Sequence, residues 1–182
     1  MASDIKILSV NCQGLNSYTK RRDVFTFLRE KHFNIYCLQD THFTKNIEKT
    51  VYAQWGYTAY FSSFASNARG TAILINNNVE HKVIRDQIDP SGNFILLDII
   101  IESQRFSLLT LYGPNKDNPE FYEQLNTYLN DFGNEHTIIC GDFNLVLNPE
   151  LDTENYRNVN NPRARNKVIE LMEERNLCDA YR

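Results

Sequence analysis

The sequence predicts an α/β domain in which helices pack on a sandwich of mixed β-sheets. Short apolar runs rich in β-branched residues alternate with clusters of turn-forming residues along most of the chain. Strand patterns outnumber helical patterns, and both parallel and antiparallel connections are implied. A doubly wound nucleotide-binding sheet fits poorly, because no Gly-rich phosphate loop follows the first strand.

The opening of the chain predicts a β-α-β unit. Ile5–Val10 alternates apolar and polar residues as a strand does, and Ile35–Gln39 is a second short strand. Between them, Arg21–Lys31 carries apolar residues at helical spacing with charges elsewhere. A helix between two strands favours a parallel pair.

The middle of the chain predicts antiparallel strands joined by turns. The clusters NNN, DPSGN and ESQ separate apolar runs, as is typical of hairpins. The predicted strands are Tyr57–Phe61, Thr71–Ile75, Val79–Arg85, Phe94–Ile101 and Phe106–Leu111.

The last third predicts two helices around one strand. A helix begins after Asn118, because Pro119 suits its first position and apolar residues follow along one side. Thr137–Cys140 reads as a strand, and Asn148–Pro162 as a long polar surface loop. Arg163–Asn176 predicts an amphipathic helix.

The bulk properties indicate one folded domain over residues 1–182. The chain is 42% hydrophobic and 23% charged, which is ordinary for a globular protein. Its net charge of −4 excludes a protein that relies on unspecific phosphate clamping. Contact with nucleic acid must therefore come from a local patch or a metal ion.

Targeting and redox features are few. The four cysteines are widely spread without a C-x-x-C pair, so we expect neither disulfides nor zinc. The N-terminus does not resemble a signal peptide, and no apolar run approaches the roughly 20 residues that span a bilayer. We expect an intracellular protein without membrane contact.

Polar residues that can hold a hard cation recur where predicted strands end. Asn11 follows ILSV, Asp40 follows IYCLQ, and Asp142 and Asn144 follow TIICG. Strand ends can deliver side chains from distant parts of a sequence to one place, and carboxylates and carboxamides are ligands that Mg²⁺ and Mn²⁺ prefer. The alternative is that Asp and Asn simply favour turns.

Four strings decide between these alternatives. ILSVNCQGLN, CLQDTH, LYGPN and GDFN, in that order, resemble the endonuclease/exonuclease/phosphatase superfamily. More narrowly, the opening string and the closing ERNLCDAYR resemble the endonuclease domain of LINE-type non-LTR retrotransposons, relatives of apurinic/apyrimidinic endonucleases. The resemblance covers essentially the whole chain and implies a four-layer α-β-β-α sandwich with two mixed sheets.

The resemblance implies a role for six residues. Asp40 and Asn11 would serve the metal, Mg²⁺ or Mn²⁺; Asp142 would position or deprotonate the attacking water; Asn144, Tyr112 and Asn115 would contact the phosphate. Chemically, the metal neutralises developing charge, amide and phenol donors complete an oxyanion site, and a carboxylate handles the proton. By residue type alone, Tyr112 could equally be a strand-end residue and Asn115 a turn residue.

Four other features are interpreted as structural. We expect Gln39 to lock a strand end, and His42 to be structural, since the family's essential histidine lies elsewhere. The basic run Lys20–Arg22 reads as a solvated helix start, with steering of DNA as the alternative. Arg69 reads as part of a turn into a strand, with contact to a nucleic-acid backbone as the alternative.

The chain departs from the family pattern in two ways. Asp40 stands where the family has Glu, and a side chain about 1.5 Å shorter leads us to expect reduced activity. The family also continues with further strands that supply two Asp residues and a catalytic His. We therefore expect a C-terminally truncated domain with missing strands, an exposed sheet edge and little hydrolysis by this polypeptide alone.

Three functions remain as hypotheses. The first is an incomplete Mg²⁺-dependent DNA-nicking endonuclease, with DNA as partner, a reverse transcriptase domain in the full-length polyprotein, and a nuclear location if it acts on chromosomal DNA. The second is a catalytically dead remnant or binding module of the same fold. The third keeps the chemistry on phosphoinositides, sphingomyelin or RNA tails, and the LINE-like segments disfavour it.

Overall fold

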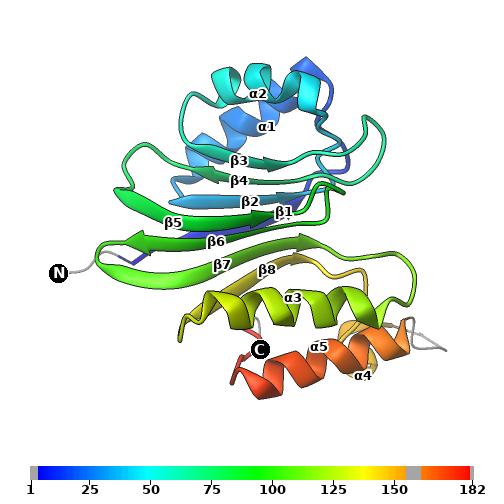
Figure 1. Ribbon diagram of the computed structural model, residues 1–182. Helices are drawn as coiled ribbons and strands as arrows, with labels where there is room; N and C mark the ends of the chain where they lie inside the picture. Colours follow the sequence, from blue (N-terminus) through cyan, green and yellow to red (C-terminus); the bar gives the residue numbers. More distant parts are fainter. Residues whose placement is uncertain (1–3, 155–160, 181–182) are drawn as a thin grey trace.

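The computed structural model, which describes residues 4–154 and 161–180, is a four-layer α-β-β-α sandwich (Figure 1). Two four-stranded sheets face each other in the middle. Helices α1 (Tyr18–Lys31) and α2 (Glu48–Trp55) cover the outer face of one sheet, and α3 (Pro119–Phe132) and α5 (Pro162–Glu174) cover the outer face of the other. The predicted fold class is confirmed.

The first sheet combines a parallel and two antiparallel pairings. Its order is β1-β2-β4-β3, with β1 and β2 parallel, as the β-α-β opening predicts. The pairs β2–β4 and β3–β4 are antiparallel. The strand bounds are Ile7–Asn11 for β1, Ile35–Gln39 for β2, Ala59–Ser62 for β3 and Thr71–Ile75 for β4.

The second sheet is also mixed. Its order is β5-β6-β7-β8, with two antiparallel hairpins and then a parallel β7–β8 pair across the helix α3. The strand bounds are His81–Ile88 for β5, Phe94–Ile101 for β6, Gln104–Tyr112 for β7 and Thr137–Asp142 for β8.

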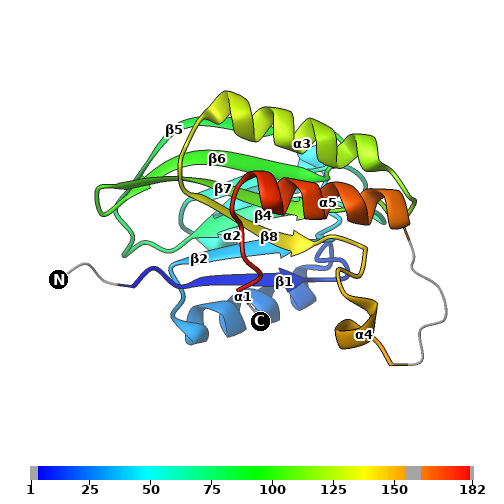
Figure 2. The same cartoon turned by 90° about the horizontal axis from the view of Figure 1, so that it is seen from below.

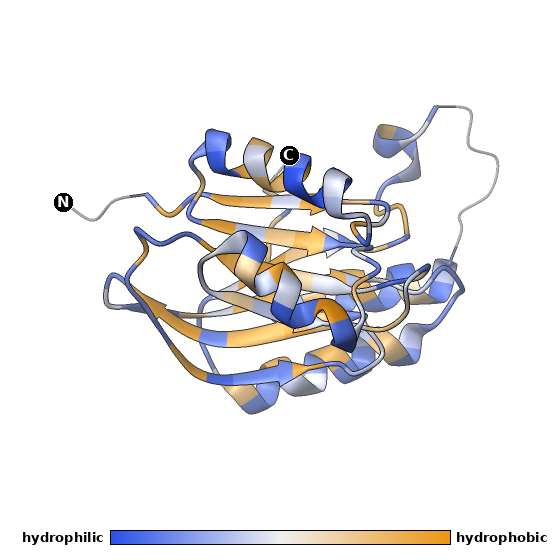
Figure 3. Cartoon of the chain, turned by 90° about the horizontal axis from the view of Figure 1, so that it is seen from above, coloured by the Kyte–Doolittle hydropathy of each residue, from blue (hydrophilic) through white to orange (hydrophobic). Residues whose placement is uncertain are grey.

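The central strands are buried on both faces because helices cover each sheet. Every residue of β2 and β4 is buried, and alternate side chains point to opposite layers. Tyr36 and Leu38 pack under α1 and α2, whereas Ile35 and Cys37 pack between the sheets. The apolar strands and polar outer helix faces are visible in Figure 3.

One helix and one cationic contact were not predicted. The helix α2, which follows a short 3-10 turn η1 (Lys45–Ile47), buries Val51 and Trp55 against the first sheet. Arg21 was expected in a solvated helix start, but it is only 3% exposed. Its guanidinium donates to the carbonyl oxygens of Leu15 and Asn16, at 2.8 and 3.0 Å, so it fastens the β1–α1 loop to the helix.

A buried carboxylate secures the far end of the second sheet. Asp98 on β6 has no exposed side-chain surface and accepts two hydrogen bonds from Arg105, at 2.8 and 2.6 Å. Asn134, just after α3, donates to the same carboxylate at 3.0 Å. The Arg105 guanidinium and these neighbours lower the pKa of Asp98 against the effect of burial, so the group stays charged.

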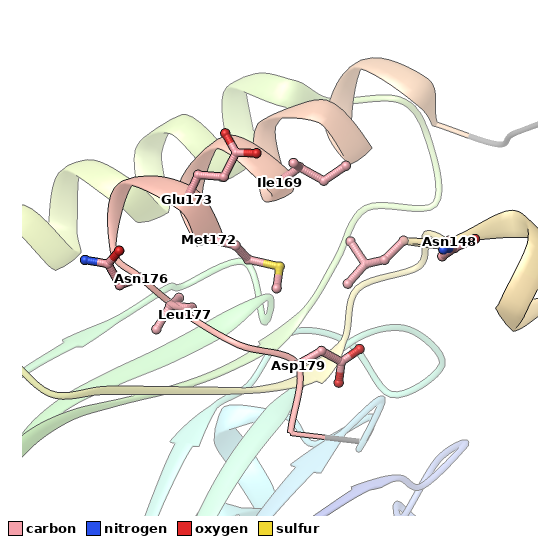
Figure 4. Close-up of a pocket in the computed structure, with 8 residues that line it drawn as sticks. Asn148, Ile169, Met172, Glu173, Asn176, Leu177 and Asp179 are labelled. Carbon is pink, nitrogen blue, oxygen red and sulfur yellow. The ribbon is translucent and has the colours of Figure 1, made fainter. Parts of the chain in front are cut away.

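Two edge strands lie along one flank of the described part of the chain. β1 ends the first sheet and β8 ends the second, and Ile138 on β8 is 37% exposed (Figure 2). The segment after α5 lies beside β8, where Leu177 and Asp179 line a pocket with Met172 and Leu147 (Figure 4).

The described start of the predicted loop Asn148–Pro162, up to residue 154, includes a short helix. The helix α4 (Pro149–Asp152) begins at Asn148, whose side-chain oxygen accepts from the backbone of Glu150 and Leu151. Residues 155–160 of this loop lie outside the described residues. Among the described residues, no helix has the length and apolar character needed to cross a membrane.

Candidate functional site

The two sheets are joined at one end by a hydrogen bond between predicted site residues. Asn11 is the last residue of β1, and Asp142 is the last residue of β8. The Asn11 Nδ2 donates to Asp142 Oδ2 at 2.7 Å, although the residues are 131 positions apart in sequence. β1 and β8 run side by side and point to the same end of the sandwich (Figure 2), so the strand ends converge as expected.

Glycine at position 141 sets the position of Asp142. Gly141 has φ +147°, and a Cβ there would collide with the backbone carbonyl oxygen of Leu111 on β7. This close approach holds the end of β8 against β7. The backbone carbonyl of Asp142 accepts from Gly113 N at 2.7 Å, which ties the ends of β7 and β8 together.

Asn144 completes a tight turn around the same carboxylate. Its backbone N donates to Asp142 Oδ1 at 2.9 Å, and its side-chain Nδ2 donates to the Gly113 carbonyl at 2.7 Å. Asn144 has φ +51°, a left-handed conformation that Asn tolerates better than most residues. Asp142 therefore accepts one hydrogen bond on each carboxylate oxygen, and these two bonds fix the orientation of its carboxylate.

Tyr112 lies near the carboxylates of Asp40 and Asp142. Burial raises the pKa of its phenol, and the Asp40 and Asp142 carboxylates raise it further. The side chains of Asn144 and Asn115 act in the opposite direction on this pKa as hydrogen-bond partners. The structure thus brings Tyr112 together with four of the other predicted site residues.

Asp40 faces a histidine. Asp40 follows β2 and is 17% exposed at its side chain, and its Oδ1 lies 3.0 Å from His42 Nε2. Both residues have positive φ, +51° and +58°, and non-glycine residues in this conformation concentrate at functional sites. A Cβ on Gly14 would lie 2.8 Å from His42 Nδ1, so the β1–α1 loop holds the imidazole in place.

Gln39 links the two sheets directly below the site. It is 1% exposed, and its Nε2 donates to Thr110 Oγ1 on β7 at 3.0 Å. Its Oε1 accepts from Ser9 Oγ on β1 at 3.3 Å. The expected structural role therefore extends further than one strand end, because Gln39 connects β1, β2 and β7.

A groove beside Asn11 contains carboxylates that the strand-end pattern does not reveal. This groove, of about 420 Å³, is lined by Asn11, Asp142, Asp152 and Asp179, among others. Asp152 comes from α4 and Asp179 from the segment after α5 (Figure 4). Neither follows a predicted strand, so only the position of Asp179 in the closing string ERNLCDAYR could have drawn attention to it.

The donors at this end suit a hard divalent cation. Within residues 4–154 and 161–180, no three His, Cys, Asp or Glu side chains are arranged to hold a metal. Mg²⁺ commonly takes only one or two protein carboxylates and keeps water and substrate oxygens as its other ligands. A single carboxylate such as that of Asp40 meets that requirement, with the Asn11 amide as the second predicted ligand, whereas zinc prefers Cys and His.

Comparisons with known proteins agree with this fold. The family model described as Endonuclease/Exonuclease/phosphatase family matches residues 8–165. The Transposon TX1 uncharacterized 149 kDa protein of Xenopus laevis is 24% identical over 183 residues, covering 98% of this chain and 14% of that protein. The chain thus spans a small part of that relative.

Solved structures show the same architecture. An AP endonuclease from Archaeoglobus fulgidus superposes with a TM-score of 0.70 at 19% identity, over 94% of this chain and 71% of that chain. The endonuclease domain of TRAS1, a telomere-specific non-LTR retrotransposon, gives a TM-score of 0.60 at 14% identity, over 91% and 71% of the two chains. Because the family model matches residues 8–165, which is most of this chain, the chain belongs to the endonuclease/exonuclease/phosphatase family.

Proposed function

We propose that this chain is a Mg²⁺- or Mn²⁺-dependent phosphodiesterase that nicks DNA as the endonuclease domain of a retrotransposon-type protein. The observation that carries the proposal is the 2.7 Å hydrogen bond between Asn11 and Asp142, with Tyr112 and Asn144 at the same strand ends. The similarity to a transposon protein and to a retrotransposon endonuclease domain supports DNA as the substrate.

The proposed division of labour assigns the metal to Asp40 and Asn11. Asp40 offers a partly buried carboxylate, and Asn11 offers an amide already oriented by its bond to Asp142. A divalent ion bound there supplies neutralisation of charge on the scissile phosphate. The carboxylates of Asp40 and Asp142, which both act on Tyr112, favour a cation at this end of the sandwich.

The proton and the phosphate are assigned to the other four residues. Asp142 is held in place by its two hydrogen-bond donors and can orient or deprotonate a water molecule. Asn144, Asn115 and Tyr112 carry the hydrogen-bond donors for the phosphate oxygens. The raised pKa of Tyr112 keeps its phenol protonated over a wider pH range, which a donor to an anionic group requires.

A non-catalytic binding module is the second candidate function, and the Asp40–His42 pair favours it. One oxygen of Asp40 already lies 3.0 Å from an imidazole nitrogen, which leaves less of the carboxylate for a metal. In that case the chain would bind DNA without cutting it.

We further propose that the domain works within a polyprotein that also carries a reverse transcriptase. The Xenopus relative has a mass of 149 kDa, of which this chain matches 14%, so most of that protein lies outside the matched region. Action on chromosomal DNA would place such a protein in the nucleus.

The test is the nicking of supercoiled plasmid DNA. The chain is incubated with plasmid in Mg²⁺, in Mn²⁺ and in EDTA, and the open-circular product is measured over time. We expect product only with metal and at a low rate, because Asp40 is shorter than the Glu of the family. Asp142→Asn should lower that rate by about a further 10²- to 10⁴-fold, because a positioned general base contributes that much.

The control is Asp23→Asn on the exposed face of α1, where Asp23 forms a surface ion pair with Arg22. Its rate should equal that of the unmodified chain. No nicking, or equal nicking by Asp142→Asn, removes the catalytic proposal. Metal-independent binding of the same plasmid then favours the binding module.

A further inference from the structure

An exposed aromatic ring and an arginine form a pair beside the candidate site. Phe64 is 48% exposed, and the Arg69 Cζ lies 5.0 Å from the centroid of its ring. Both belong to the β3–β4 loop, which an isolated β-bridge between Ala65 and Ala68 narrows. A single exposed phenylalanine is common on protein surfaces, so its placement decides what it means.

The loop is hydrogen-bonded on both arms to the segment that carries Asp40 and His42. On one arm, Phe64 N donates to the Phe43 carbonyl at 3.0 Å. On the other arm, His42 N donates to the Arg69 carbonyl at 2.8 Å. The exposed pair is therefore fixed to the backbone on which the candidate metal-binding carboxylate lies.

The opposite side of the pair is fixed to Tyr112. Gly70 N donates to the Gly92 carbonyl at 3.0 Å, and Tyr112 N donates to the carbonyl of the next residue, Asn93, at 2.7 Å. A Cβ on Gly92 would lie 2.7 Å from the Phe64 Cβ, so the β5–β6 turn packs against the base of the Phe64 side chain. The loop lies at the end of the sandwich where the site strands finish (Figure 1).

We propose that Phe64 and Arg69 form a platform on which an unpaired nucleobase of the substrate strand stacks, next to the phosphodiester at the site. This proposal rests on the proposed function and deepens it by naming locally unpaired DNA as the favoured substrate. Bases stack on aromatic rings and on the plane of a guanidinium. A base could stack on the Phe64 ring or on the Arg69 guanidinium, whose Cζ lies 5.0 Å from the ring centroid.

The Phe64–Arg69 pair offers a local positive charge and a stacking surface in a chain that is acidic overall. The protein carries a net charge of −4, so its overall field repels nucleic acid. A rigid stacking surface with one local positive charge attracts a base and its phosphate together without a basic face. Stacking also tolerates any base, because every base has a π-face, so the platform selects unpaired geometry rather than sequence.

The experiment measures binding of the full chain to short DNA in EDTA, without cleavage. A single-stranded oligonucleotide and its duplex each carry 2-aminopurine, whose fluorescence falls when it stacks. We expect tighter binding and stronger quenching with the single strand. Phe64→Ala should weaken that binding about 5- to 100-fold and abolish the quenching, whereas Phe64→Trp should retain both.

The chain offers a matched control on α1. Phe27 is 49% exposed and has Lys31 Nζ 4.8 Å from its ring centroid, on a helix away from the site. Phe27→Ala should leave the dissociation constant and the quenching unchanged. Phe64→Leu keeps the bulk of the side chain without the ring, so it tests stacking even if the alanine variant folds poorly.

Three results overturn the proposal. In the first, Phe64→Leu binds the single strand as tightly as the unmodified chain does. In the second, Phe27→Ala and Phe64→Ala lose the same amount of binding. In the third, the unmodified chain shows no detectable binding. The two proposals fail separately. If the unmodified chain does not nick plasmid but shows Phe64-dependent quenching, only the proposal of hydrolysis fails. If it nicks plasmid but its DNA binding does not depend on Phe64, only the platform proposal fails.

Discussion

Replacing the buried Asp98 with Asn should destabilise the fold without touching the site. The carboxylate has no exposed surface and accepts on Oδ1 from Arg105 and Asn134, and on Oδ2 from Arg105. An asparagine has one oxygen and one NH₂ group in place of the two carboxylate oxygens. Its NH₂ group would therefore face at least one N–H donor, and at least one charge-assisted hydrogen bond is lost. Such a bond contributes about 1.5–3 kcal/mol.

The magnitude lies near the lower end of that range. The Arg105 side chain is 50% exposed, so water can hydrate the guanidinium when its partner is lost. We therefore expect a loss of about 2 kcal/mol in the free energy of unfolding. With a urea dependence of about 2 kcal/mol per molar, the midpoint of urea unfolding falls by about 1 M.

The difference in urea midpoint between the unmodified chain and Asp98→Asn should depend on pH. The pKa of Asp98 is lowered in the folded state, so its charge stabilises the fold above the unfolded pKa of about 3.9 and loses that effect as the pH falls through the folded value. Urea titrations at pH 7 and at decreasing acidic pH should show the two midpoints converging.

The control is again Asp23→Asn, since Asp23 forms an ion pair with Arg22 in which the side chains are 66% and 58% exposed. It should shift the midpoint by less than about 0.5 M, because exposed pairs contribute little. A shift in Asp98→Asn as small as that in the control, or one that grows on acidification, would refute the reasoning.

Three further changes have defined outcomes. Gly141→Ala forces a methyl group against the backbone of β7, so urea unfolding should show a loss of about 1–3 kcal/mol and plasmid nicking should fall. Asn118→Ala removes the side-chain acceptor at the start of α3, so thermal unfolding followed by circular dichroism should show a loss of about 1 kcal/mol. Burial raises the pKa of Cys12 to about 12, so at pH 7 to 9 its thiol stays protonated. Peptide mapping after brief alkylation should find the exposed Cys178 modified and Cys12 intact, and early modification of Cys12 would contradict its burial.

The central strands could be predicted because their burial leaves a strong pattern. β2, β4 and β6 are nearly continuous apolar runs, since both faces are covered. The helix α2 was missed because only Val51 and Trp55 are buried in its eight residues, which gives too short an apolar stripe to distinguish from a loop.

Contacts between distant segments limited the remaining predictions. Arg21 belongs to a basic run that resembles a solvated helix start, and only the folded β1–α1 loop and Gln54 supply its acceptors. The candidate site residues could be proposed from the sequence because Asn11, Asp40 and Asp142 all stand at strand ends. Asp179 and Phe64 do not, and their places follow from how α5 and the β3–β4 loop pack.

The bond between Asn11 and Asp142 also makes the site a late product of folding. Its two halves belong to different sheets and are separated by 131 residues, so chain closure over nearly the whole domain precedes it. Each sheet can assemble its own hairpins and helices beforehand. Partly folded chains therefore carry secondary structure but no assembled site, and Asn11 and Asp142 meet only when the two sheets dock.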